Sequence, residues 1–107
     1  PLYDKTRYMG SMTDITTGPV ASAITDRLTA ALAPSHLDVV NESAHHRGHS
    51  GDDGSGESHF RVVIVSAAFA GVSRVERQRM VNRALADLLA ERIHALAIVA
   101  RAPGEAL

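Results

Sequence analysis

The segment from residue 57 to residue 81 constrains the fold of this chain more than any other part of the sequence. It contains a β-branched run, Arg61–Val65, whose residue types favour an extended strand. Gly71 follows at a position where the chain can turn. The tetrad S-R-V-E from Ser73 to Glu76 matches a capping box, in which the two side chains bond each other's backbone amides. The segment therefore predicts a strand, a turn and a helix, in that order.

The predicted strand, from His59 to Ser66, has the pattern of a central strand in a sheet. Successive side chains of a strand point to opposite faces. One face carries Phe60, Val62 and Ile64, and the other carries Arg61, Val63 and Val65. Because both faces become apolar toward the end of the strand, we expect neighbours on both of its sides.

Two elements are expected before this strand. Thr17 is a candidate cap for a helix that Pro34 ends, since the residue before a proline is disfavoured in a helix. Its apolar residues recur at helical spacing: Val20, Ile24, Leu28 and Ala31. A short strand is expected over residues 37–41. Across the glycine-rich loop of residues 43–56, it is predicted to pair antiparallel with the strand that follows.

Three elements are expected from the capping box onward. A short helical turn leads into a main helix over about residues 78–92, and an apolar strand follows over residues 95–100. The buried stripe of that helix is predicted to be Val81, Leu85, Leu88 and Leu89. The order α-β-β-α-α-β predicts an α+β fold, with a three-stranded mixed sheet and helices on one face.

The chain is expected to form one domain over residues 13–107, and residues 1–12 resemble an expression-tag remnant. The net charge is −1, so there is no overall positive field that would attract nucleic acid. No apolar run approaches the roughly 18 residues that a membrane-spanning helix needs. No export signal is recognisable, which favours a cytoplasmic location and no membrane partner.

Four separated motifs, in this order, resemble the BolA family. They are N-E-S at 41–43, E-S-H-F-R-V-V-I-V-S at 57–66, F-A-G-V-S-R-V-E-R-Q-R-M-V at 69–81 and I-H-A-L-A-I at 93–98. The resemblance covers residues 20–105 and implies a class II KH-like α+β domain. It also implies a non-enzymatic partner of monothiol glutaredoxins that shares a [2Fe–2S] cluster in iron–sulfur trafficking or iron and redox regulation. For bacterial members it implies, as an alternative, a DNA-binding transcription regulator of stress response and morphology.

His94 lies between the main helix and the last predicted strand. A histidine there can simply satisfy carbonyls at the end of the helix, where positive charge is favourable. It can also be a metal ligand. The resemblance favours the second interpretation, since BolA proteins carry a cluster-ligating histidine at this position.

Three histidines, His45, His46 and His49, lie in the loop. They are either solvated polar residues or ligands that reach a metal held by another chain. Alignment on N-E-S places the family's usual loop ligand at His46 and a second frequent histidine at His49. The family often has another histidine directly after N-E-S, where this chain has Ala44, so which loop histidine binds stays open.

The chain has no cysteine, which limits what it can offer to a cluster. Two histidines can replace two of the four thiolates at one iron, so this chain supplies at most the histidine half. A glutaredoxin cysteine and a glutathione thiol fit the other half. We expect the isolated chain to bind no cluster and to be a monomer or a weak homodimer. His59 is predicted to be a structural or supporting residue, and His36 is assigned no role.

An arginine stripe on the predicted helical region has two interpretations. It is either a solvated face paired with Glu76 and Asp87, or a surface for DNA phosphates or an acidic partner. The arginines are Arg74, Arg77, Arg79 and Arg83. The family's usual R-H-R is R-Q-R here, and the G-x-x-G clamp of RNA-binding KH domains is missing. No nucleophile–base pair, paired-carboxylate motif or phosphate loop is present, so we expect no enzyme.

Overall fold

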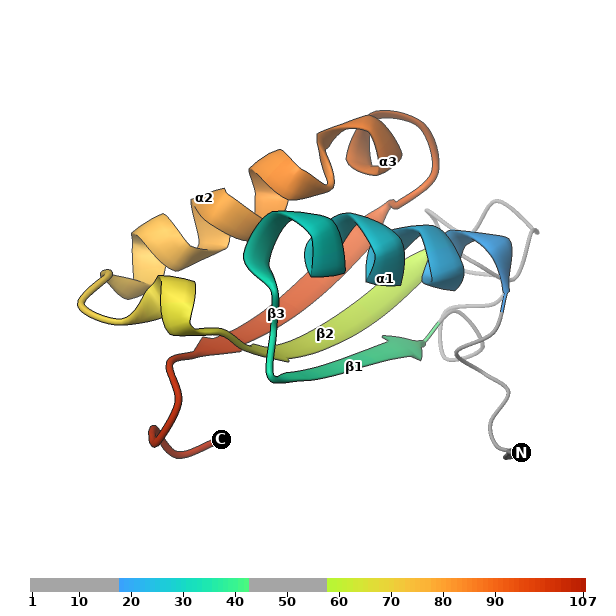
Figure 1. Cartoon of the computed structure of the whole chain (residues 1–107). Coiled ribbons are helices and arrows are strands. Elements are labelled where there is room, and N and C mark those ends of the chain that lie inside the picture. Colours follow the sequence, from blue (N-terminus) through green and yellow to red (C-terminus); the bar gives the residue numbers. More distant parts are fainter. Residues whose placement is uncertain (1–17, 43–57) are drawn as a thin grey trace, which may run out of the picture.

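The computed structural model describes residues 18–42 and 58–107 (Figure 1). The elements, in chain order, are α1 (Pro19–Leu32), β1 (His36–Asn41), β2 (His59–Val65), the 3₁₀ turn η3 (Ala67–Phe69), α2 (Arg74–Ala84), α3 (Ala86–Glu91) and β3 (Ala95–Arg101). The predicted α+β class and element order are confirmed. The expected cap Thr17 is wrong, since Gly18 is the N-cap of α1 and no side chain bonds there, while Pro19 lies in the first turn. Thr17 itself and residues 1–12 lie outside the described residues.

The three strands form one mixed sheet in the order β1-β2-β3. β2 is central, as predicted: it pairs antiparallel with β1 and parallel with β3. Figure 1 shows the helices on one face of the sheet, and no helix or strand of residues 18–42 and 58–107 covers the other face. The alternation in β2 follows this arrangement, since Phe60, Val62 and Ile64 are buried and Arg61 is exposed. Two layers, one of helices and one of strands, therefore enclose the core.

The core is a single cluster of apolar side chains between the sheet and the helices. Its fully buried members come from every layer: Val20, Ile24 and Leu28 of α1, Val62 and Ile64 of β2, Phe69 of η3, Val81 of α2 and Leu85 beside α3. The predicted helix stripe of Val81, Leu85 and Leu88 is confirmed, and Leu89 is partly buried. The buried stripe of α1 differs from the expected one in two residues. Ala21 is buried, and Ala31 is exposed.

The helical region after Gly71 differs from the predicted turn followed by a helix over residues 78–92. α2 begins earlier, at Arg74, because the Ser73 hydroxyl accepts a hydrogen bond from the Glu76 amide at 3.2 Å. Only this half of the predicted capping box is observed, since the Glu76 carboxylate accepts from Arg83 instead. The helix is interrupted at Leu85, whose φ of −107° and ψ of 14° fall between the helical and extended regions. Gly71 makes the predicted turn with a φ of 73°.

A buried serine joins the end of α1 to the end of β2. The Ser66 hydroxyl donates to the Leu32 carbonyl at 2.5 Å and accepts from the Ala68 amide at 3.1 Å. Carbonyls in the last turn of a helix have no partner within the helix, so this bond satisfies one of them. Ser66 is 1% exposed, and water cannot replace it without local opening.

Replacing Ser66 by Ala is expected to lower the free energy of unfolding by about 1–2 kcal/mol. The Leu32 carbonyl loses its hydrogen bond and η3 loses its N-terminal cap. Urea denaturation followed by circular dichroism measures the change. Ser35→Ala is the matched control, since the Ser35 hydroxyl reaches the Val65 carbonyl at only 3.4 Å on an exposed surface. Equal losses in the two variants would contradict this role for Ser66.

Candidate functional site

The parallel pairing of β2 and β3 brings together two histidines that are 35 positions apart in sequence. His59 pairs with Ala95 in this register. His94, which precedes Ala95, therefore lies beside the start of β2. Its backbone amide donates to the Ser58 carbonyl at 2.7 Å. The centroids of the His59 and His94 rings are 6.4 Å apart, and the rings meet edge to face at 68°. The two rings therefore form one site, here called the histidine pair.

The two histidines have different surroundings. His59 is 7% exposed, and its Nδ1 lies 2.9 Å from the hydroxyl of the fully buried Ser58. His94 is exposed. The second nitrogen of a ligating imidazole is usually held by a hydrogen-bonding partner, which fixes the tautomer and the orientation of the ring. His94 is therefore the histidine of the pair that a group on another molecule can reach, while His59 is held within the domain.

A shallow hollow of about 240 Å³ adjoins the histidine pair. Its lining residues are Glu42, His59, Phe60, Ala95, Leu96 and Ala97. The Glu42 amide donates to the His59 carbonyl at 2.8 Å, and its carboxylate accepts from Arg61 at 3.1 Å. Glu42 and Ser58, which flank residues 43–57, are thus both fixed at the end of the sheet that carries the histidine pair.

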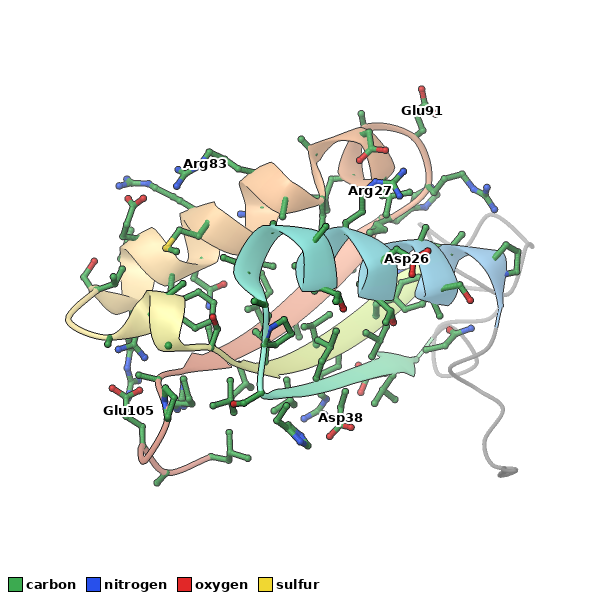
Figure 2. The ribbon with its side chains drawn as sticks, viewed as in Figure 1. Asp26, Arg27, Asp38, Arg83, Glu91 and Glu105 are labelled. Atoms are coloured by element: carbon green, nitrogen blue, oxygen red, sulfur yellow. The ribbon has the colours of Figure 1, made fainter. Side chains whose placement is uncertain are left out.

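The predicted loop ligands, His45, His46 and His49, lie outside the described residues. Within residues 18–42 and 58–107, no three histidine, aspartate or glutamate side chains form a group that could hold a metal ion. His36 is at the opposite end of the sheet, where it pairs with Val65 in β1–β2 register and with the Asp38 carboxylate at 3.0 Å. Figure 2 shows Asp38 on the face of the sheet away from the helices.

The four predicted arginines do not form one stripe. Arg79 and Arg83 both contact the Glu76 carboxylate, at 3.5 Å and 3.1 Å, and the bond from Arg83 lowers the Glu76 pKa. Arg77, in contrast, is buried, so the expectation that it belongs to an exposed contact surface is wrong. The expected pairing of the stripe with Asp87 is also wrong.

Asp87 of α3 instead pairs with Arg27 of α1 at 2.7 Å. Figure 2 shows Arg27 between these two helices. The bond from Arg27 lowers the pKa of Asp87. Because both side chains are largely exposed, the pair contributes little to stability.

Arg77 is held by an ion pair that the sequence did not predict. Its Nε donates to the Val72 carbonyl at 2.8 Å, and its two terminal nitrogens lie 2.6 Å and 3.0 Å from the Glu105 carboxylate. One of them also donates to the Ala100 carbonyl at 3.1 Å. Gln78 donates to the Ile98 carbonyl at 3.3 Å in the same way. Side chains of α2 thereby cover carbonyls of β3, which is an edge strand and exposed to unwanted pairing.

These contacts were missed for different reasons. Glu105 follows a Pro-Gly turn, and nothing in its local pattern points to a residue 28 positions earlier. Ser58 had a clearer signal, since it immediately precedes a histidine at the start of a strand, where a hydroxyl can hold a ring nitrogen.

Comparison with known proteins assigns this chain to a family. A family model described as BolA-like protein matches residues 28–105. The chain belongs to the BolA-like protein family. A Sinorhizobium protein described as uncharacterized, in the cobS 5′ region, is 51% identical over 80% of this chain and 94% of its own length. Human BolA-like protein 1 is 48% identical over 82% of this chain, and the chain spans only 61% of that BolA-like relative.

Two further BolA relatives carry names that bear on function. The DNA-binding transcriptional regulator BolA of Vibrio cholerae is 46% identical, over 74% of this chain and 71% of its own length. Among solved structures, the BolA domain of SufE1 from Arabidopsis thaliana superposes with a TM-score of 0.74 and 39% identity, over 83% of this chain and 98% of that domain. In the described part of the present BolA-like chain, no helix is both long and apolar enough to cross a membrane.

The Arg77–Glu105 pair predicts a pH dependence of stability. The hydrogen bond from Arg77, followed by that from the Ala102 amide, lowers the Glu105 pKa from an ordinary 4.5 to about 2. An acidic group whose pKa is lowered by folding stabilises the protein at pH values above the pKa of that group in the unfolded chain. This stabilisation is lost as the pH falls through the pKa of the group in the folded protein. Wild type is therefore expected to melt above Glu105→Gln at pH 6, and the difference is expected to disappear between about pH 4.5 and pH 2.

Thermal melts of both proteins across that pH range measure this difference. Glu91→Gln is a control, since Glu91 is an exposed residue at the end of α3. A difference between wild type and Glu105→Gln that stays constant down to pH 2 would contradict the assignment to the Glu105 carboxylate.

Proposed function

We propose that this BolA-like chain is a non-enzymatic adaptor that pairs with a monothiol glutaredoxin and contributes histidine ligands to a shared [2Fe–2S] cluster. The observation that carries the proposal is the histidine pair. It presents an exposed imidazole, His94, at the end of the sheet where β2 and β3 begin. Glu42 and Ser58, which flank the histidine-rich residues 43–57, are fixed at the same end.

The donor set fits half of such a cluster. The chain offers imidazole nitrogens and no thiolate, and two histidines on one iron are a known replacement for two cysteines. When bound, the cluster supplies one-electron redox chemistry and can itself be passed on as cargo. The thiolates are assigned to the glutaredoxin cysteine and to glutathione, so the isolated chain is expected to hold no cluster.

Within this proposal the residues of the chain have separate tasks. His94 offers its ring nitrogen to the partner-held iron, and His59 with Ser58 holds the surroundings of that ring in place. The second ligand comes from the loop, with His46 the first choice and His49 the second.

Mixing the chain with a cluster-loaded monothiol glutaredoxin is expected to change the visible absorption and circular dichroism of the cluster, because imidazole replaces a ligand of the iron. His94→Ala is expected to abolish this change. His36→Ala is the matched control, since His36 is exposed, lies at the far end of the sheet and pairs with Asp38. An unaltered spectrum on mixing with wild type, or an unaltered change with His94→Ala, would contradict the proposal.

The same assay assigns the loop ligand. Single replacements of His45, His46 and His49 by Ala are compared, and His46→Ala is expected to have the largest effect. Size-exclusion chromatography of each mixture separates loss of the ligand from loss of the protein complex. A variant that still forms the heterodimer but leaves the cluster spectrum unchanged has lost a ligand.

A DNA-binding regulator is the second candidate function. It is supported by the name of the Vibrio cholerae relative. Against it, Arg79 and Arg83 share the Glu76 carboxylate, Arg77 is buried and the net charge is −1. Fluorescence anisotropy with a labelled DNA duplex over increasing salt tests it. Each phosphate contact is expected to add about −0.9 to the slope of log affinity against log salt, so a flat dependence would contradict phosphate binding.

A further inference from the structure

A second hollow, of about 410 Å³, lies at the end of the sheet opposite to the histidine pair. It is lined by Arg74, Arg77, Arg101, Glu105, Ala106 and Leu107. β3 runs from Ala95, beside the histidine pair, to Arg101, so the two sites are roughly 20 Å apart at about 3.3 Å per residue. Figure 2 shows Glu105 below the first turns of α2. This hollow is therefore separate from the proposed cluster site and does not depend on it.

The charges around this hollow do not balance. Its lining includes three guanidinium groups and a single side-chain carboxylate, Glu105. That carboxylate is held at both of its oxygens by Arg77, so it compensates a charge that is already buried. Within residues 18–42 and 58–107, neither Arg74 nor Arg101 takes part in a salt bridge. Arg101 nevertheless acts on Glu105 at longer range, since its charge helps to lower the Glu105 pKa. The lining therefore carries more guanidinium groups than side-chain carboxylates.

Arg101 is held in place by neutral groups. Its Nε donates to the Ala106 carbonyl at 2.9 Å, and its Nη1 donates to the Ala100 carbonyl at 3.0 Å. These bonds fix the guanidinium without neutralising it, and in the described part of the chain its other terminal nitrogen donates in no such bond. Arg74 is the first residue of α2 and is exposed. One guanidinium is thus pre-oriented and the other is free to close on a ligand.

We propose that this hollow, the Arg74–Arg101 pocket, binds a phosphate group. A guanidinium presents its N–H donors in a planar fork that matches the oxygens of phosphate, and such charge-assisted bonds are stronger than neutral ones. A phosphate monoester carries a charge between about −1.5 and −2 at neutral pH, opposite in sign to the guanidinium groups that outnumber the side-chain carboxylate of the lining. The group can come from a small phosphate-bearing ligand or from a nucleic-acid backbone, because the recognised chemistry is the same.

The chain offers a matched set of variants for the test. Arg74→Gln and Arg101→Gln each remove one positive charge from the pocket. Arg79→Gln is the control, since Arg79 lies on the same helix but contacts Glu76 outside the pocket. Glu105→Gln removes the carboxylate in the lining and frees Arg77, so it is expected to strengthen binding severalfold. Circular dichroism establishes that each variant is folded before binding is measured.

Amide chemical shifts of the ¹⁵N-labelled full chain are followed while inorganic pyrophosphate, or in a separate arm a short DNA duplex, is added at constant ionic strength. We expect saturable shifts around residues 74–77 and 101–105. Each single arginine variant of the pocket is expected to weaken binding about tenfold, and Arg79→Gln to leave it unchanged.

The outcomes of the two arms are distinct. Binding of pyrophosphate that is lost in Arg74→Gln and Arg101→Gln supports the proposal with a small ligand as the source. Binding of the duplex alone, with the same losses, supports it with the nucleic-acid backbone as the source. The proposal is overturned if neither ligand gives saturable shifts, or if Arg79→Gln weakens binding as much as the pocket variants do. None of these outcomes depends on a glutaredoxin.

Discussion

The parallel pairing of β2 with β3 is the constraint on which the rest of this structure depends. Parallel neighbours cannot be joined by a tight turn, so the chain must cross over between them. Here the crossover is formed by η3, α2 and α3, which lie on the face of the sheet that α1 also covers (Figure 1). The register of this pairing sets His59 opposite Ala95 and so brings His94 beside Ser58. The packing of the core and the geometry of the histidine pair therefore have the same cause.

The same pairing separates the molecule into two functional ends. At the start of β3, an exposed imidazole lies beside a buried one, in a chain that has no thiolate to offer. At the end of β3, arginines surround a carboxylate that Arg77 holds at both oxygens. We propose that the first end meets a metal centre that another protein helps to hold, and that the second binds an oxyanion. Membership of the BolA-like family accounts for the fold, while each end requires its own chemical test.

Sequence patterns predicted the strands better than the helices. The alternation in β2 predicts the buried face of the strand directly, because Phe60, Val62 and Ile64 all point to the same side of the sheet. The helix bounds were less predictable, because a capping serine sets the start of α2 and the backbone at Leu85 interrupts it. Arg77 shows the limit most clearly. Its burial depends on Glu105 and on the Ala100 carbonyl, both distant in sequence, and no local pattern distinguishes it from exposed Arg79. The histidine pair was foreseen as two separate residues, and only the strand register brings them together.

The central claim is that a partner-held cluster meets this protein at the histidine pair. Amide resonances of the ¹⁵N-labelled chain, recorded while a cluster-loaded monothiol glutaredoxin is added, test it most directly. The account predicts that signals of residues 58–60 and 93–96 shift and broaden, because they lie next to the metal centre, while signals around Glu105 keep their positions. Broadening confined to the Glu105 end, or no change at residues 93–96 when a heterodimer has formed, would contradict it.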